Sequence, residues 1–99
     1  MGEFEQLVLL AILRLGNDAY GMEVREEIER RTGREISYGA VYTTLDRLEG
    51  KGFASHRLGE ATAERGGRAR KYFRVEPAGR EALRSTRAVV AVMSEGVTL

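Results

Sequence analysis

The side chains that could contact a charged partner gather in two stretches of the sequence. The first stretch offers hydroxyl and guanidinium groups near the start of a predicted helix: Ser37, Tyr38, Tyr42, Thr43 and Arg47. Hydroxyl groups there lie where backbone N–H groups and the helix dipole attract phosphate, and Gly39 lets another backbone approach closely. The second stretch, residues 54–74, has a net charge of +4, whereas residues 1–53 have −3. This segregation favours a polyanionic partner, although a basic run is also typical of a solvated face.

The sequence holds little from which an enzyme's active site could be built. It has no cysteine and one histidine, His56, which excludes disulfides, thiol nucleophiles and zinc sites made of cysteines or paired histidines. No nucleophile–base pair is visible, and Gly66-Gly67 lacks the following helix and lysine of a phosphate-binding loop. We therefore expect no enzyme activity, no metal and no cofactor, and we expect His56 on the surface of a strand.

Length and composition indicate one folded domain that spans residues 1–99. A chain of 99 residues with 42% hydrophobic and 31% charged residues can build a single modest core. The longest apolar run, Leu7 to Leu13, has seven residues, far fewer than the roughly 20 that cross a bilayer. Its acidic N-terminal flank does not resemble a signal peptide. We expect a cytoplasmic protein that does not interact with a membrane.

Hydrophobic periodicity predicts a mainly α-helical chain with a small β-hairpin. The helices are expected at about residues 3–15, 19–31, 37–50 and 77–93. Asp18 and Ser37 are suitable N-caps, Gly16 ends the first helix, and Pro77 suits a first helical turn. The apolar run in residues 7–13 would also fit a buried strand, but its leucines and alanine favour a helix.

The middle of the chain has the pattern of a helix-turn-helix followed by a wing. The second and third helices are joined by about five residues, although antiparallel helix pairs without a DNA role look similar. Strand-like residues 54–58 and 71–75 enclose a glycine- and arginine-rich tip, as a long β-hairpin requires. Tyr72 and Phe73 alternate on the second strand, so one of them is expected in the core.

Four motifs in register resemble the PadR family of winged helix-turn-helix transcriptional regulators. Tyr20-Gly21-Met22-Glu23-Val24 is similar to the family's opening of the second helix, and the sequence SYGAVYTTLDRLEGKG at residues 37–52 is similar to its recognition helix. GRARKYF at residues 67–73 resembles the family's wing stretch, and the pair Ala78-Gly79 follows as in the family. Order and spacing agree from about residue 5 to residue 83, which implies a short family member without a long C-terminal domain.

The chain departs from the family's pattern at three positions. Tyr38 and Thr43 stand where the family usually has proline, and Glu76 stands where it has a threonine cap. Tyr38 and Thr43 add hydrogen-bonding groups to the surface expected to face DNA. The operator preference of relatives is therefore not transferred to this chain.

Together, the resemblance and the side-chain chemistry imply that double-stranded DNA is the partner. The residues expected to bind it are Tyr20, Ser37, Tyr38, Gly39, Tyr42, Thr43, Arg47, Arg68, Arg70 and Lys71. Tyr42, Thr43 and Arg47 are expected at the major groove, whereas the three wing cations suit phosphate or the minor groove. Tyr42 is also compatible with a core aromatic whose hydroxyl reaches the surface. Arg47 is also compatible with an ion pair on its own helix, and the wing arginines with a solvated turn.

Two apolar surfaces remain once a core of this size is built. The helix at 3–15 is apolar nearly all the way round, and the helix at 77–93 is apolar near its end. We expect a homodimer whose interface contains Phe4, Leu7, Leu10, Leu83, Val89, Val90 and Met93. The family resemblance implies the same pair of helices. The run at 88–93 would also fit a short strand, but the sequence leaves no strand to pair with it.

The predicted function is sequence-specific regulation of transcription, as a repressor-type homodimer on a palindromic operator. Winged-helix folds also serve as protein-interaction modules, but a hairpin of net charge +4 favours the DNA-binding alternative. The resemblance implies a small-molecule effector, often aromatic or cationic, in a cavity at the dimer interface. The sequence has no tryptophan to stack such a molecule, so a regulator without an effector, or one that acts through a partner protein, is an open alternative. The sequence identifies neither an effector nor an operator.

Overall fold

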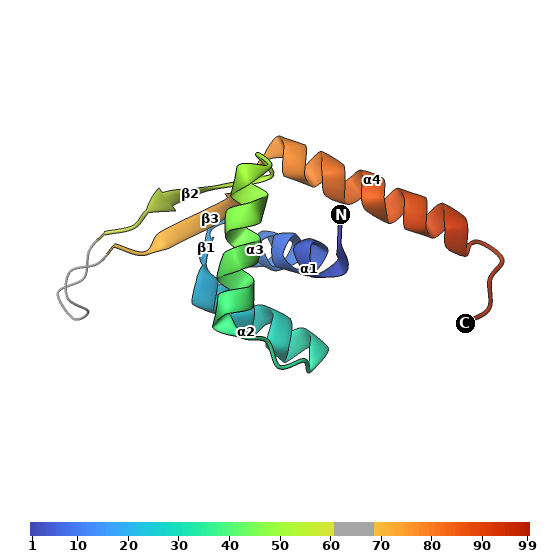
Figure 1. The fold of residues 1–99 in the computed structure, drawn as a ribbon, viewed down its shortest axis with the longest axis horizontal. Coiled ribbons are helices and arrows are strands. Elements are labelled where there is room, and N and C mark those ends of the chain that lie inside the picture. The colour runs from blue at the N-terminus through green and yellow to red at the C-terminus, as the bar shows by residue number, and fades with distance from the viewer. Residues whose placement is uncertain (61–68) are drawn as a thin grey trace.

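The computed structural model describes residues 1–60 and 69–99 of the chain. Within these residues the chain forms four helices and three strands: α1 (Glu3–Arg14), β1 (Ala19–Tyr20), α2 (Gly21–Thr32), α3 (Tyr38–Gly50), β2 (Ala54–Leu58), β3 (Lys71–Val75) and α4 (Pro77–Ser94). The body consists of α1, α2 and α3 packed together, with the sheet beside them (Figure 1). The strands β2 and β3 and the far half of α4 leave this body on opposite sides. The predicted winged helix-turn-helix arrangement is confirmed.

The core lies where the three body helices meet the inner face of the sheet. Its fully buried side chains include Leu9 and Ile12 of α1, Leu45 and Leu48 of α3, and Phe73 of β3. The apolar run of the first helix is therefore helical, as predicted, and Phe73 is the core member of the Tyr72–Phe73 pair.

All the predicted helix boundaries are confirmed to within two residues. The Ser37 hydroxyl caps α3 by accepting a hydrogen bond from the Ala40 N–H at 3.1 Å. Pro77 occupies the first turn of α4. After α1, Gly16 and Asn17 both have left-handed backbone conformations, with φ of 84° and 59°, which turns the chain sharply toward β1.

The predicted Asp18 cap is wrong, and the second helix starts later than expected. Residues 19 and 20 form β1, which pairs antiparallel with β3 and adds a third strand to the predicted hairpin. Tyr20 is the N-cap of α2, and its N–H donates to the Glu23 carboxylate at 3.1 Å. Pairing with a distant strand thus overrides the local capping signal of Asp18.

The helix α4 begins against the body and then leaves it. Gly79 and Leu83 are buried, whereas Val89, Val90 and Met93 are 60%, 59% and 76% exposed. The apolar run at 88–93 is helical, not a strand. In the described part of the chain, no helix combines the length and the apolar character needed to cross a membrane.

Candidate nucleic-acid interface

One side of α3, together with its N-cap, faces outward and carries half of the residues predicted to bind DNA. Val41, Leu45 and Leu48 recur at helical spacing and are fully buried, so they fix which side of α3 faces the core. The predicted DNA-binding residues that are exposed here are Ser37, Tyr38, Gly39, Thr43 and Arg47. The structure therefore places these five residues on, or just before, the part of α3 that is turned away from the core.

The N-terminus of α3 concentrates hydrogen-bond donors. Ser37 accepts from Ala40 N–H, and the Ser37 carbonyl accepts from Val41 N–H at 3.4 Å. The N–H groups of Tyr38 and Gly39 belong to the first turn, which has no partners inside the helix. Together with the helix dipole, they offer a site for a phosphate group.

Tyr42 is half-buried at the contact between the two helices of the helix-turn-helix. A Cβ added at Gly21, the first residue of α2, would lie 2.7 Å from the Tyr42 ring. The Tyr42 ring also packs against the ring of Tyr38, with ring centres 4.6 Å apart. Burial and, next, hydrogen bonding with Tyr38 raise the pKa of Tyr42 to about 12. Its hydroxyl is therefore protonated at neutral pH, and its aromatic ring has the packing role that the sequence left open.

Arg47 is exposed toward the C-terminal end of α3. Among the residues that the structure describes, the ion pairs do not include Arg47. The nearby Lys51 binds Glu5 of α1 at 2.9 Å, and this hydrogen bond is the main cause of the lowered pKa of Glu5. Arg47 thus forms no ion pair on its own helix in the described residues, although its charge adds to the lowering of the pKa of Glu5 of α1.

The two predicted wing cations that the structure describes have different surroundings. Lys71 is exposed on β3, whereas the Arg70 guanidinium lies over the Tyr20 ring at 4.4 Å from its centre. Arg68 lies outside the described residues. Tyr20 is half-buried and packs edge-on against Tyr72, with ring centres 5.6 Å apart. Tyr20 therefore lies at the base of the wing.

Part of the wing's positive charge is neutralised within the chain. Arg57 forms an ion pair with Asp18 at 2.7 Å, and Arg74 forms one with Glu76 at 3.3 Å. Arg57 belongs to the basic stretch counted in the sequence, but no local motif marks it as a site residue. Only the cross-strand register, which no local pattern reveals, brings it beside Tyr72.

The single histidine, His56, contacts a carboxylate of its own chain. His56 lies on β2, as predicted for a surface strand residue, and its Nδ1 is 2.8 Å from the Glu49 carboxylate oxygens. In the described ranges, no three histidine, aspartate or glutamate side chains are grouped so that they could hold a metal ion.

The residues predicted for the dimer interface fall into three environments. Phe4, Leu7 and Leu10 of α1 are partly buried. Val89, Val90 and Met93 of α4 are exposed, whereas Leu83 is only 5% exposed. Leu83 is already covered by its own chain, so it anchors α4 to the body and leaves no open apolar surface of its own.

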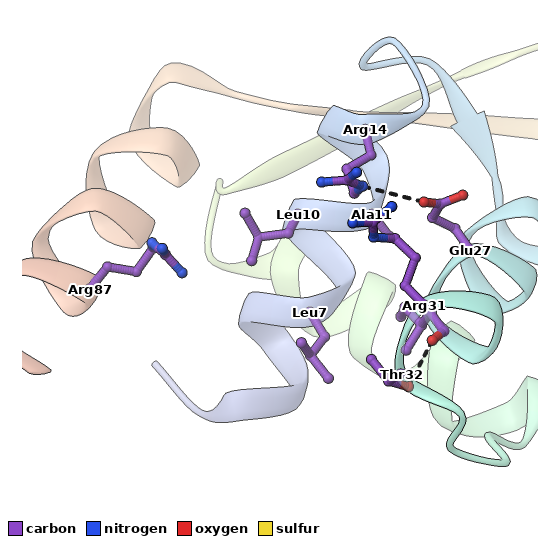
Figure 2. A pocket seen from close by; sticks show the side chains of 9 residues that line it. Leu7, Leu10, Ala11, Arg14, Glu27, Arg31, Thr32 and Arg87 are labelled. Carbon is purple, nitrogen blue, oxygen red and sulfur yellow. Dashed lines mark hydrogen bonds and ion pairs between the residues drawn. The ribbon is translucent and has the colours of Figure 1, made fainter. Parts of the chain in front are cut away.

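An open hollow of about 360 Å³ lies between α1, α2 and α4. Figure 2 shows Leu7, Leu10 and Ala11 of α1 on one side and Arg87 of α4 across from Leu10. On the side of α2, Glu27 pairs with Arg14 at 3.4 Å. The hollow therefore combines apolar α1 side chains with a charged margin, and two of its lining residues, Leu7 and Leu10, are among those predicted for the dimer.

Comparison with known proteins agrees with this arrangement. The family model described as the transcriptional regulator PadR-like family matches residues 9–85. The chain is 35% identical over 102 residues to the transcriptional regulator Rv3488 of Mycobacterium tuberculosis, covering 98% of this chain and 89% of the relative.

Solved structures show the same fold. A PadR-like transcription factor from Bacteroides fragilis has a TM-score of 0.79 at 23% identity, over 95% of this chain and 85% of that one. A winged-helix DNA-binding protein from STIV has a TM-score of 0.71 at 20% identity, over 97% and 96% of the two chains. With the family match over most of its length, and with a helix-turn-helix and a wing in place, this chain belongs to the PadR-like family of transcriptional regulators.

Proposed function

We propose that this chain is a sequence-specific DNA-binding repressor that acts as a homodimer on a palindromic operator in the cytoplasm. The observation that carries the proposal is the exposed stripe of α3. It starts at a helix N-terminus that favours phosphate and continues through Thr43 to Arg47. Such a helix can enter the major groove, where side chains distinguish the four base pairs.

The wing supplies affinity that does not depend on base sequence. Lys71 is an exposed ammonium group, and Arg70 is a guanidinium whose position is fixed by an aromatic ring. Both are suited to the DNA backbone, because a phosphate needs only charge and donors from its partner. The α3 stripe would then select the sequence, and the wing would strengthen binding to all sequences.

The homodimer is supported by the apolar residues that one chain leaves uncovered. Val89, Val90 and Met93 extend along the free half of α4, and Leu7 and Leu10 line the open hollow beside it. A second copy could cover both surfaces through a two-fold axis. The two copies of α3 would then lie about 34–36 Å apart, which matches half-sites one helical turn apart.

Thr43→Ala or Arg47→Ala is expected to relax the base preference at one position in each half-site. The cost at the preferred base is about 1–3 kcal/mol, the usual contribution of a specific side-chain contact to a base. Competition binding with duplexes that differ at single positions measures the effect. A uniform loss for every sequence would mean that these side chains contact only the backbone.

Replacing both Arg70 and Lys71 by alanine is expected to weaken binding to specific and random duplexes alike. The slope of log affinity against log salt should decrease by about 0.9 for each DNA phosphate that the variant no longer neutralises. Affinity measured at several salt concentrations gives this slope. An unchanged slope would exclude the wing cations from the interface.

The proposed function is tested by fluorescence anisotropy on the DNA upstream of the protein's own gene. The titration runs from low to physiological salt, with a scrambled duplex as competitor. Saturable binding that survives the competitor supports a specific regulator. Equal affinity for both duplexes at every salt concentration would favour a protein-interaction module.

A further inference from the structure

A row of side chains crosses the outer face of the sheet at the base of the wing. Tyr72 of β3 is paired with Tyr20 of β1 on one side and with Arg57 of β2 on the other. Side chains directly opposite each other in an antiparallel sheet point to the same face. Their neighbours in register, Ala19 and Phe73, are fully buried on the other face. The row therefore lies outside the core.

Each member of this row contacts the next. The Arg57 guanidinium lies over the Tyr72 ring at 4.5 Å from its centre, and Tyr72 packs edge-on against Tyr20. Arg70 covers the other tyrosine, Tyr20. Cation–π and edge-to-face contacts of this kind have preferred geometries, so the four side chains constrain one another.

Asp18 holds the Arg57 end of the row in a fixed orientation. Its two carboxylate oxygens accept from Arg57 Nε at 3.1 Å and from Nη2 at 2.7 Å. This two-pronged bond requires the planar fork of arginine and fixes both the position and the angle of the guanidinium. Asp18 lies just before β1 and α2, so the bond joins the wing to the start of the helix-turn-helix.

The backbone of the wing is shaped to accept the Tyr72 ring. A Cβ at Gly59 would lie 2.5 Å from that ring, so a glycine is needed where the chain leaves β2. The Gly59 N–H donates to the Arg70 carbonyl at 2.7 Å and extends the pairing of the two strands. The same ring is thus packed against the Gly59–Arg70 pair and against Arg57.

The wing needs such side-chain contacts at its base because most of it is a two-stranded ribbon. The strands β2 and β3 pair along five residues each, but only two residues of β3 are also paired with β1. A two-stranded hairpin is marginally stable alone. Its direction relative to α3 must therefore be set by side chains at its base.

We propose that Asp18, Arg57 and Tyr72 form a positioning site that fixes the wing relative to α3, so that Arg70 and Lys71 meet the DNA backbone. Arg57 is a positioning residue that acts through the two others. The inference rests on the proposed DNA-binding function, and it assigns a role to Asp18 and Arg57, which no motif marks as site residues. It also gives Tyr20 a role at the base of the wing.

Asp18→Asn separates this role from a simple charge effect, because the two predict opposite signs. Removing a carboxylate near a DNA-binding surface would by itself strengthen binding. Loss of the positioning site should instead weaken binding to a mixed-sequence duplex about tenfold and lower the salt slope by about 0.9 for each DNA phosphate that is no longer neutralised. Anisotropy at several salt concentrations measures both. Unchanged or stronger binding would overturn the proposal.

Two further variants and one control complete the test. Arg57→Lys keeps the charge but loses the fork, so it should behave like Asp18→Asn; wild-type behaviour would contradict the proposal. In a chain that already carries Arg70→Ala and Lys71→Ala, Asp18→Asn should cause no further loss of affinity. A persisting loss would mean that Asp18 acts on the whole fold. Glu35→Gln removes an exposed carboxylate just before α3 and should leave binding unchanged or slightly stronger.

A measurement without DNA keeps the inference separate from the proposed function. Amide hydrogen exchange in the full chain should be faster at Gly59 in the Asp18→Asn variant, whereas the core amides of α1 and α3 keep their wild-type rates. Unchanged exchange at Gly59 would overturn the positioning site even if the wild-type chain binds DNA. Faster exchange in a chain that binds no DNA would retain the site and reject the repressor.

Discussion

A chain carrying Val89→Glu together with Met93→Glu is expected to be monomeric and to bind its operator at least about 100-fold more weakly than the wild type. Both side chains are exposed in the single chain and lie one turn apart on α4. Burying two carboxylates in an apolar interface is strongly unfavourable. A monomer reaches one half-site at a time and loses the second, intramolecular binding event, which accounts for about 10²–10⁴ in affinity.

The matched control adds the same charge to the opposite side of the same helix. Ala88 and Ala91 are exposed and, at 100° per residue, lie about 100° to 160° around α4 from Val89 and Met93. Ala88→Glu with Ala91→Glu should remain dimeric and keep most of its operator affinity. Sedimentation and anisotropy measure the two properties on the same samples. If the Val89 and Met93 variant remained dimeric, the proposed interface would be wrong.

Gly79→Ala is expected to destabilise the fold by about 3 kcal/mol, at the upper end of the usual cost of overpacking. A methyl group at this position would overlap the Phe53 carbonyl oxygen. That carbonyl cannot easily move, because it accepts a hydrogen bond from Glu76 N–H at 2.9 Å. The clash would separate the start of α4 from Phe53, which follows the end of α3. This contact sets the direction in which α4, the proposed dimer helix, leaves the body.

Urea denaturation measures the loss, with Gly50→Ala as the control. Gly50 is the last residue of α3, and a Cβ there meets nothing within 4 Å. Alanine is favoured over glycine in helices by up to about 1 kcal/mol, so this variant should not lose stability. An unchanged midpoint for Gly79→Ala would show that the contact between α4 and Phe53 is not tight in solution.

The helices could be predicted because their signals are local. The buried spacing of Val41, Leu45 and Leu48 fixes both the helix and its exposed side, and Ser37 caps it within the same few residues. The strand β1 has no such signal, because two residues acquire their structure only by pairing with β3. Asp18 consequently has the chemistry of a helix cap and the role of an ion-pair partner.

The candidate site divides in the same way. The exposed residues of α3 follow from helical periodicity and from the family's motif, so the sequence is sufficient to select them. The cluster of Asp18, Arg57 and Tyr72 depends on cross-strand register and on a contact between distant segments, which one sequence does not encode in any short pattern. Leu83 is predicted for the dimer interface because it is apolar, but it is covered by its own chain. The sequence alone does not reveal this burial.

The central claim, that this PadR-like chain recognises a particular DNA sequence as a dimer, is tested most directly by selecting ligands for the wild-type protein from a pool of random duplexes. We predict enrichment of a two-fold symmetric sequence whose half-sites lie one helical turn apart, bound more tightly than the starting pool at physiological salt. Enrichment of no sequence, or affinity for the selected duplexes equal to that for the starting pool, would contradict it.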